Sequence, residues 1–306
     1  MLERFLVPLD PTLGAEAVLP LVTRLAKALR QPVVLLSVLP DAAPLDAAEH
    51  APVIDGLTET RRRYAQQYLR RISAELEAAG VSASSIVETG PIADTVTTTA
   101  LAMRAGLIVM TSHAADRERW FLGSVADRVV RTASVPVLIT PQPGGDGTAA
   151  SAIKEIVVPL DGSDLAEVAL PYASFLALTL PAPMTVLRAA PPNLMITAPR
   201  PYGVDAALPL EVLAMLRRSA EAYLEKVAAP LRARGIDVKT RFAAVSSPAD
   251  SVTELAGRTD GALIVMATHG QSGLGRALLG SVTDRVIRSA SAPVLVIRAA
   301  SDAIVL

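Results

Sequence analysis

The chain contains an internal repeat that covers almost its whole length. Residues 6–10 (LVPLD) return as residues 157–161 (VVPLD), 151 positions later. An apolar LIVM run recurs at 107–110 and 263–266, and a GSVxDRV segment begins at both Gly123 and Gly280. The segments keep the same order, so the repeat predicts two tandem domains of one fold. With 306 residues, the chain is long enough for each domain to bury its own core.

We place the two domains at residues 1–140 and 152–300. The segment PQPGGDGTAAS at 141–151 separates them, and its Pro and Gly content without periodic apolar residues indicates a linker. Two further Pro-rich segments, 41–55 and 191–208, follow the second expected strand of each copy. They are longer than ordinary connections, so they are either lids or partner surfaces, or plain surface loops.

Short apolar runs alternate with helical patterns within each copy. In the first copy, strands are expected at 3–9, 33–39, 84–88, 106–110 and 136–140, and helices near 14–30, 57–79, 92–104 and 124–133. Apolar runs without polar alternation are typical of strands buried on both faces of a parallel sheet. The pattern therefore predicts the α/β class: two tandem doubly wound, Rossmann-like domains, each with a mostly parallel five-stranded sheet and helices on both faces.

Composition argues against several classes of function. A net charge of −1 and an aromatic content of 3% disfavour a nucleic-acid partner. The chain has no cysteine, which excludes disulfides and thiolate metal sites, and its three histidines are not clustered with metal-ligand spacing. No apolar run approaches the ~18 residues of a membrane span, and the N-terminus has no signal-peptide pattern. We therefore expect a soluble, cytoplasmic protein.

A glycine-rich loop separates the apolar run at 263–266 from the helical pattern that starts at Gly280-Ser281. A helix start in this position presents unpaired N–H groups and the positive end of the helix dipole, which together favour an anion such as phosphate. Arg276 adds positive charge, and 267–281 contains no acid. The alternative is a glycine-rich connection without a ligand.

These residues together resemble the universal stress protein family in its tandem two-domain form. In the nucleotide-binding branch of that family the loop reads Gly-x2-Gly-x9-Gly-Ser/Thr, and the second copy carries Ala267-x2-Gly270-x9-Gly280-Ser281. Alanine replaces the first glycine. The added methyl group is tolerable if the backbone of Ala267 has a negative φ, but not if φ must be positive.

The resemblance implies that the second copy binds ATP, or alternatively ADP or AMP, with or without Mg²⁺. It places Asp161 near the ribose, the main chain of Ala189 at the adenine, and His269 beside the base and phosphates. It implies no catalytic residue and no metal ligand. The implied nucleotide-binding residues are Pro159, Leu160, Asp161, Ala189, Met266, Ala267, His269, Gly270, Gly280, Ser281, Val282 and Thr283.

The first copy departs further from the family pattern. Its loop has Ala114 in place of the second glycine and only eight residues between Ala114 and Gly123. We expect a degenerate domain that serves structure. Asp10, Val38 and the Gly123-Ser124 pair are retained, so residual nucleotide binding is the alternative.

Three functions follow in order of preference. The first is a stress-response protein in which adenine nucleotide bound to the second copy acts as a signalling or assembly switch. The second is a nucleotide-free dimerising scaffold, and the third is a slow ATPase that uses Asp161 with His269. The resemblance also implies a homodimer formed through the last strand of the repeats.

From the residues alone, Asp10 and Asp161 are equally consistent with capping the helix that follows.

Overall fold

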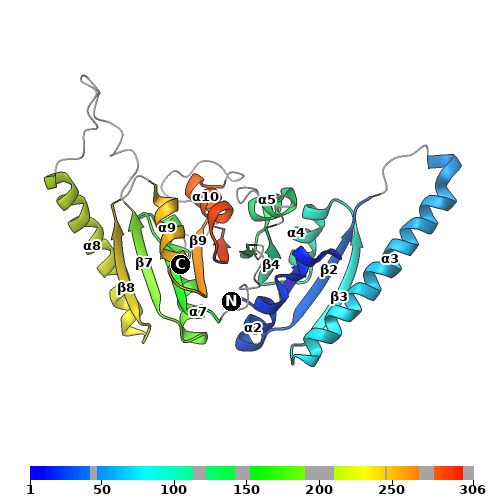
Figure 1. Ribbon diagram of the computed structural model, residues 1–306, viewed down its shortest axis with the longest axis horizontal. Helices are drawn as coiled ribbons and strands as arrows, with labels where there is room; N and C mark the ends of the chain where they lie inside the picture. Colours follow the sequence, from blue (N-terminus) through cyan, green and yellow to red (C-terminus); the bar gives the residue numbers. More distant parts are fainter. Residues whose placement is uncertain are drawn as a thin grey trace, which may run out of the picture. The chain divides into compact units, whose positions relative to one another are not determined.

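The computed structural model describes residues 1–41, 47–112, 122–141, 152–189, 210–244, 247–268 and 279–298. The chain divides into two compact units, Met1–Ala150 and Ser151–Leu306. In each unit, helices and strands alternate along the sequence (Figure 1). No helix among the described residues has the length and apolar character needed to cross a membrane.

Among the described residues, each unit is built on five parallel strands. In the first unit their order across the sheet is β3-β2-β1-β4-β5, and in the second it is β8-β7-β6-β9-β10. These are the same order, which confirms the predicted pair of Rossmann-like α/β domains. The strands are β1 (Phe5–Pro8), β2 (Val33–Leu39), β3 (Ala83–Thr89), β4 (Leu107–Thr111), β5 (Val137–Thr140), β6 (Glu155–Pro159), β7 (Met184–Ala189), β8 (Val238–Ala243), β9 (Ala262–Ala267) and β10 (Val294–Ile297).

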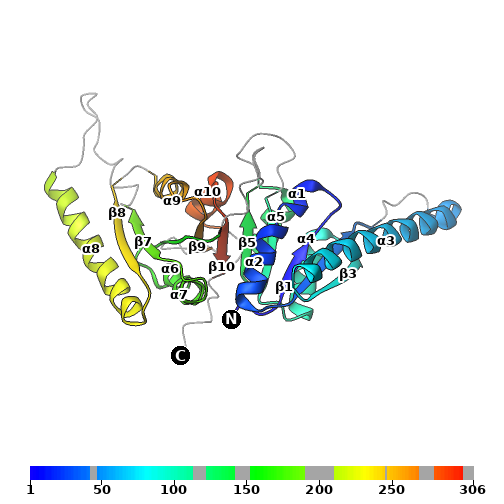
Figure 2. The same ribbon diagram turned by 60° about the horizontal axis from the view of Figure 1, so that its bottom comes forward.

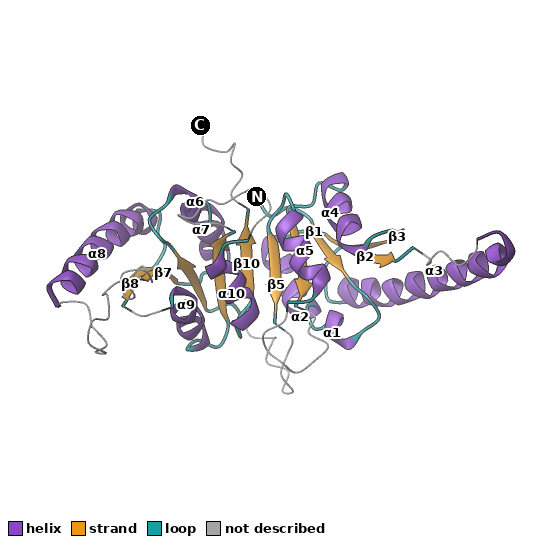
Figure 3. Cartoon of the chain, turned by 90° about the horizontal axis from the view of Figure 1, so that it is seen from above, coloured by secondary structure: helices purple, strands orange, loops and turns teal. Residues whose placement is uncertain are grey.

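Helices cover both faces of each sheet. Strand order runs one way from the first strand to the third and then reverses, so right-handed crossovers place the first three helices on one face and the last two on the other (Figure 3). The long helix of the second unit, α8, packs along β7 and β8 (Figure 2). The helices are α1 (Leu13–Glu16), α2 (Leu19–Leu29), α3 (Ala47–Ala78), α4 (Ile92–Ala102), α5 (Ser124–Thr132), α6 (Asp164–Glu167), α7 (Leu170–Thr179), α8 (Leu210–Ala233), α9 (Pro248–Gly257) and α10 (Ser281–Ser289).

The helix expected at 14–30 is two helices, α1 and α2. Pro20 lies at the start of α2, where its missing N–H costs nothing. In one continuous helix the Pro20 ring would clash with the carbonyl of Glu16, four residues earlier. Pro171 divides α6 from α7 in the same way. The repeated Leu-Pro pair therefore marks a helix boundary in both units.

The helix expected to begin near residue 57 begins at Ala47, so most of the segment at 41–55 is helical and not the loop that its proline content predicted. Residues 42–46 lie outside the described residues. The corresponding segment of the second copy, 191–208, also lies outside them.

The connection before β9 depends on a single glycine. Gly261 has φ +88°, and a Cβ atom added to it would lie 2.1 Å from the carbonyl oxygen of Ala152. The Gly261 carbonyl in turn accepts a hydrogen bond from Lys154 N at 2.8 Å. This close approach brings the start of β9 beside the segment that leads into β6.

We predict that Gly261→Ala destabilises the second unit strongly. The substitution combines left-handed strain with a backbone overlap, and we expect a loss of about 3 kcal/mol in the free energy of unfolding, measured by urea denaturation. Gly235→Ala is the matched control, because Gly235 has φ +84° but nothing within 4 Å of an added Cβ. That control should cost about 1 kcal/mol. Equal losses would contradict the role of the close approach.

Candidate functional site

The strand order of the second unit reverses between β6 and β9, which are neighbours in the sheet. In open α/β sheets, ligands bind beyond the carboxyl ends of the strands at such a reversal. At this edge the chain leaves β6 through Leu160 and Asp161, and leaves β9 through Thr268. The polar groups around these strand ends therefore form the candidate site.

Two hydrogen bonds fasten the start of α10 to the end of β9. The Gly280 N–H donates to the Thr268 carbonyl at 2.8 Å. The Thr283 hydroxyl donates to the Ala267 carbonyl at 2.9 Å, and the Thr283 side chain is buried. The Thr283 hydroxyl proton thus serves a structural contact, although the family resemblance places Thr283 among the nucleotide-binding residues.

The N-terminus of α10 has a glycine as its cap. Gly280 is the N-cap residue, with φ −61° and ψ 143°, and no side chain caps the helix among the described residues. The first N–H groups of any helix lack an intrahelical acceptor, and glycine has no side chain that could supply one. The helix therefore presents the N–H groups of Ser281 and Val282 with the positive end of its dipole.

A carboxylate in the first turn of α10 is paired within the helix. Asp284 accepts two hydrogen bonds from Arg288, at 2.9 and 3.0 Å. The pair offsets the negative charge that would otherwise oppose an anion at the helix start.

Ala267 fits its position without strain. It is the last residue of β9, is buried, and is not among the described residues with positive φ. Alanine can therefore replace the first glycine of the loop, because the backbone at Ala267 does not require a positive φ.

Asp161 braces the cap of the helix that follows it. Its Oδ1 atom accepts from Ser163 N at 2.9 Å and from Ser163 Oγ at 2.6 Å, and the Ser163 side chain accepts from Ala166 N to cap α6. In the first unit, Asp10 accepts from the Thr12 hydroxyl, and Thr12 caps α1. The cap is therefore the residue two positions after the aspartate, and the carboxylate orients it.

The structure brings the described members of the predicted set to one edge of the sheet. Pro159, Leu160 and Asp161 end β6 or follow it, Ala189 ends β7, Met266 and Ala267 end β9, and residues 280–283 start α10. His269 and Gly270 lie outside the described residues, so their predicted roles stay predictions.

Sequence analysis missed a cluster beside this edge. The guanidinium of Arg188 on β7 lies 4.8 Å from the ring centroid of Tyr223 on α8, and the Tyr223 hydroxyl donates to Glu167 of α6 at 2.7 Å. Burial, and secondly the hydrogen bond to Glu167, raise the pKa of Tyr223 above its usual value. The repeat held a signal for this cluster, because Glu16 and Tyr68 occupy the corresponding positions of the first unit. The contact itself is not repeated: the buried Tyr68 hydroxyl has no hydrogen-bond partner among the described residues, and Glu16 accepts from Arg71 at 2.7 Å.

The first unit retains the glycine cap at the helix start. Gly123 is the N-cap of α5, with φ −56° and ψ 147°, and no side chain caps α5 among the described residues. Ala126 stands at the position of Thr283, however, so the hydroxyl contact to the strand end is absent from this position.

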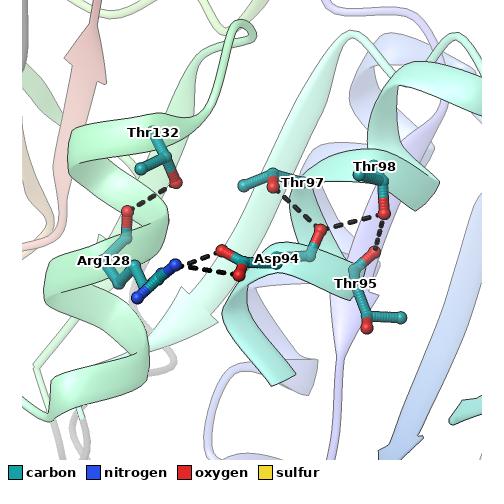
Figure 4. Close-up of polar contacts among 6 residues, drawn as sticks. All are labelled: Asp94, Thr95, Thr97, Thr98, Arg128 and Thr132. Atoms are coloured by element: carbon teal, nitrogen blue, oxygen red, sulfur yellow. Dashed lines mark hydrogen bonds and ion pairs between the residues drawn. The ribbon is translucent and has the colours of Figure 1, made fainter. Parts of the chain in front are cut away.

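An ion pair holds α5 against α4 in the first unit. Arg128 donates to both oxygens of Asp94 at 2.8 Å, and threonine hydroxyls around the two residues donate to main-chain carbonyls (Figure 4). The second unit has an equivalent pair, Arg285 with Asp250, at 3.1 Å. These side chains are about half exposed, so each pair contributes at most about 1 kcal/mol and mainly sets helix orientation.

The comparison with protein families decides the family. The model of the universal stress protein family matches the chain twice, over residues 1–141 and 152–298. The chain belongs to the universal stress protein family. A universal stress protein of Methanocaldococcus jannaschii is 32% identical over 146 residues, which are 47% of this chain and 82% of that protein.

Solved structures of two universal stress proteins share the fold over nearly the whole chain. One, from Archaeoglobus fulgidus, has a TM-score of 0.70 at 21% identity and covers 97% of this chain and 98% of its own. The other, a putative universal stress protein from Pseudomonas aeruginosa, has a TM-score of 0.63 at 18% identity, with coverages of 97% and 93%. At these identities the likeness concerns the fold alone.

We predict that Thr283→Val weakens the attachment of α10 to β9. Loss of the buried hydroxyl removes a hydrogen bond to Ala267, and we expect about 1–2 kcal/mol less stability in urea denaturation. Thr253→Val is the control, since the Thr253 hydroxyl donates at 3.2 Å to a carbonyl within its own exposed helix turn. The control should change stability by less than about 0.5 kcal/mol. A loss no larger than that of the control would show that the attachment does not depend on Thr283.

Proposed function

We propose that this universal stress protein binds ATP, or another adenine nucleotide, in its C-terminal unit, and that the bound nucleotide acts as a signalling or assembly switch in a cytoplasmic stress response. The observation that carries the proposal is the N-terminus of α10, which no side chain among the described residues caps and which is fastened to the end of β9 where the strand order reverses. Such a helix start binds phosphate through N–H groups and the helix dipole.

The neighbouring strand ends suit the rest of a nucleotide. Ala189 ends β7, where main-chain N–H and C=O groups can read the edge of an adenine without a contribution from the side chain. Asp161 follows β6, which lies between β7 and β9 in the sheet, and this position supports a role of its carboxylate at the ribose hydroxyls. Mg²⁺, where it takes part, would arrive on the phosphates.

The two units support different roles. The second has both links between α10 and β9, whereas Ala126 leaves the first without the hydroxyl link. We therefore assign nucleotide binding to the second unit and a structural role to the first. Assembly through the last strand of the repeats stays a prediction of the family resemblance.

Gly280→Asp is expected to abolish tight ATP binding without unfolding the protein. The φ and ψ angles of Gly280 are open to any L-residue, and aspartate is a favourable N-cap, so the helix should be at least as stable. Its carboxylate would occupy the phosphate site and repel the ligand. We expect an affinity loss of at least about tenfold in calorimetry, or about 1.4 kcal/mol.

The matched control is Gly123→Asp, the same change at the equivalent N-cap of the first unit. It should leave both the ATP affinity and a stoichiometry of about one nucleotide per chain unchanged, as the assignment to the second unit requires. No heat with the unaltered protein, or equal affinity after Gly280→Asp, would contradict the proposal and favour the nucleotide-free scaffold.

A further inference from the structure

The guanidinium of Arg188 contacts the loop that carries Asp161. A Cβ atom added to Gly162 would lie 3.0 Å from Nη2 of Arg188 and 3.2 Å from its Cζ. The same guanidinium lies over the ring of Tyr223. Arg188 and Ala189 are successive strand residues, so their side chains point to opposite faces of the sheet. Arg188 thus approaches the Asp161 loop from the face opposite the Ala189 side chain.

The contacts of Arg188 complete a series of interactions that starts and ends at this loop. Tyr223 donates to Glu167 on α6, and α6 is capped by Ser163, which donates to Asp161. Because burial and the bond to Glu167 raise the pKa of Tyr223, its hydroxyl stays a donor near neutral pH and its ring stays a neutral partner for the arginine. The guanidinium of Arg188 is therefore held in one place by the aromatic ring of Tyr223 and by the Asp161 loop.

Gly162 is suited to this contact in two ways. Its φ of +90° lies in the left-handed region, which L-residues adopt only with strain. Its missing side chain also leaves the space that the guanidinium of Arg188 approaches. Any other residue would disturb both the turn after Asp161 and the approach of the arginine.

The first unit lacks this contact although it keeps a glutamate and a tyrosine, Glu16 and Tyr68, at the corresponding positions. By the 151-residue offset of the repeat, Pro11 stands for Gly162 and Ser37 for Arg188. Proline fixes φ near −65°, opposite in sign to that of Gly162. The arginine over Tyr68 is Arg71, from the same helix as Tyr68 and with its centre 5.5 Å from the ring. The unit to which we assign nucleotide binding therefore has Arg188 against its strand-end loop, where the first unit has Ser37.

We propose that Arg188 and Gly162 are a positioning pair that sets the Asp161 carboxylate for the ribose hydroxyls, so that the C-terminal unit distinguishes ribonucleotides from nucleotides without these hydroxyls. The inference rests on the proposed nucleotide site. It adds Arg188, whose side chain lies on the face of the sheet opposite the Ala189 side chain. Arg188 acts through the loop without touching the ligand.

The test compares affinities for ATP and 2′,3′-dideoxy-ATP by calorimetry. The unaltered protein should prefer ATP by about tenfold, the value of one hydrogen bond to a charged group. Arg188→Ser, which introduces the residue of the first unit, should lower the ATP affinity to that of dideoxy-ATP and leave the dideoxy-ATP affinity unchanged. Arg188→Lys should restore only part of the preference, because lysine lacks the planar group that lies on the ring.

Arg241→Ser is the matched control. Arg241 is exposed on β8, next to β7 in the sheet, and should affect neither affinity. Absence of ATP binding by the unaltered protein would overturn the proposed function itself. If the unaltered protein binds both nucleotides with equal affinity, the nucleotide site stands and the positioning pair is wrong. The same conclusion follows if Arg188→Ser keeps the preference for ATP, or if it lowers the affinities for ATP and dideoxy-ATP by the same factor.

Discussion

The proposed nucleotide site depends on the hydrogen bonds that join α10 to the end of β9. A helix N-terminus binds an anion usefully only when it is fixed relative to the groups that hold the rest of the ligand. Here the Gly280 N–H and the Thr283 hydroxyl fasten it to the last carbonyls of the strand. Since β9 is hydrogen-bonded to β6, the helix start is also fixed relative to Asp161.

The tandem repeat serves as an internal comparison, because the units share a strand order but not every contact. Both keep a glycine N-cap on the helix that follows the fourth strand, and both brace the first cap with an aspartate. The second unit has Thr283 at the helix start and Arg188 against the loop, where the first has Ala126 and Ser37. Both differences lie near the carboxyl ends of the strands, where the candidate site is located.

The sequence predicted the fold well because its signals were local and repeated. Apolar runs buried on both faces, separated by helical patterns, are sufficient for a doubly wound sheet. The prediction of one helix at 14–30 was wrong, since apolar periodicity continues through Pro20 although the backbone cannot. The predicted start of α3, near residue 57, was wrong because the prolines of 41–55 indicated a loop, whereas residues 47–55 are helical.

The candidate site could be proposed from the sequence only where its residues form a motif. Spacing identified Gly280 and Ser281, and the repeat identified Asp161, because their roles depend on the backbone or on a strand end. Arg188, Tyr223 and Glu167 come from three elements that no short pattern connects, and their contacts exist only once α8 packs on the sheet. Similarly, the sequence could not show that the Thr283 hydroxyl is engaged by the Ala267 carbonyl.

The most direct test of the central claim is amide hydrogen exchange at the two helix starts, with and without ATP. If phosphate binds at α10, exchange at Ser281 and Val282 should slow on addition of ATP, because their N–H groups gain acceptors. Exchange at Ser124 and Val125, the corresponding residues of α5, should not change. Unaltered exchange at the start of α10, or equal slowing at both helix starts, would contradict the claim that the C-terminal unit holds the nucleotide.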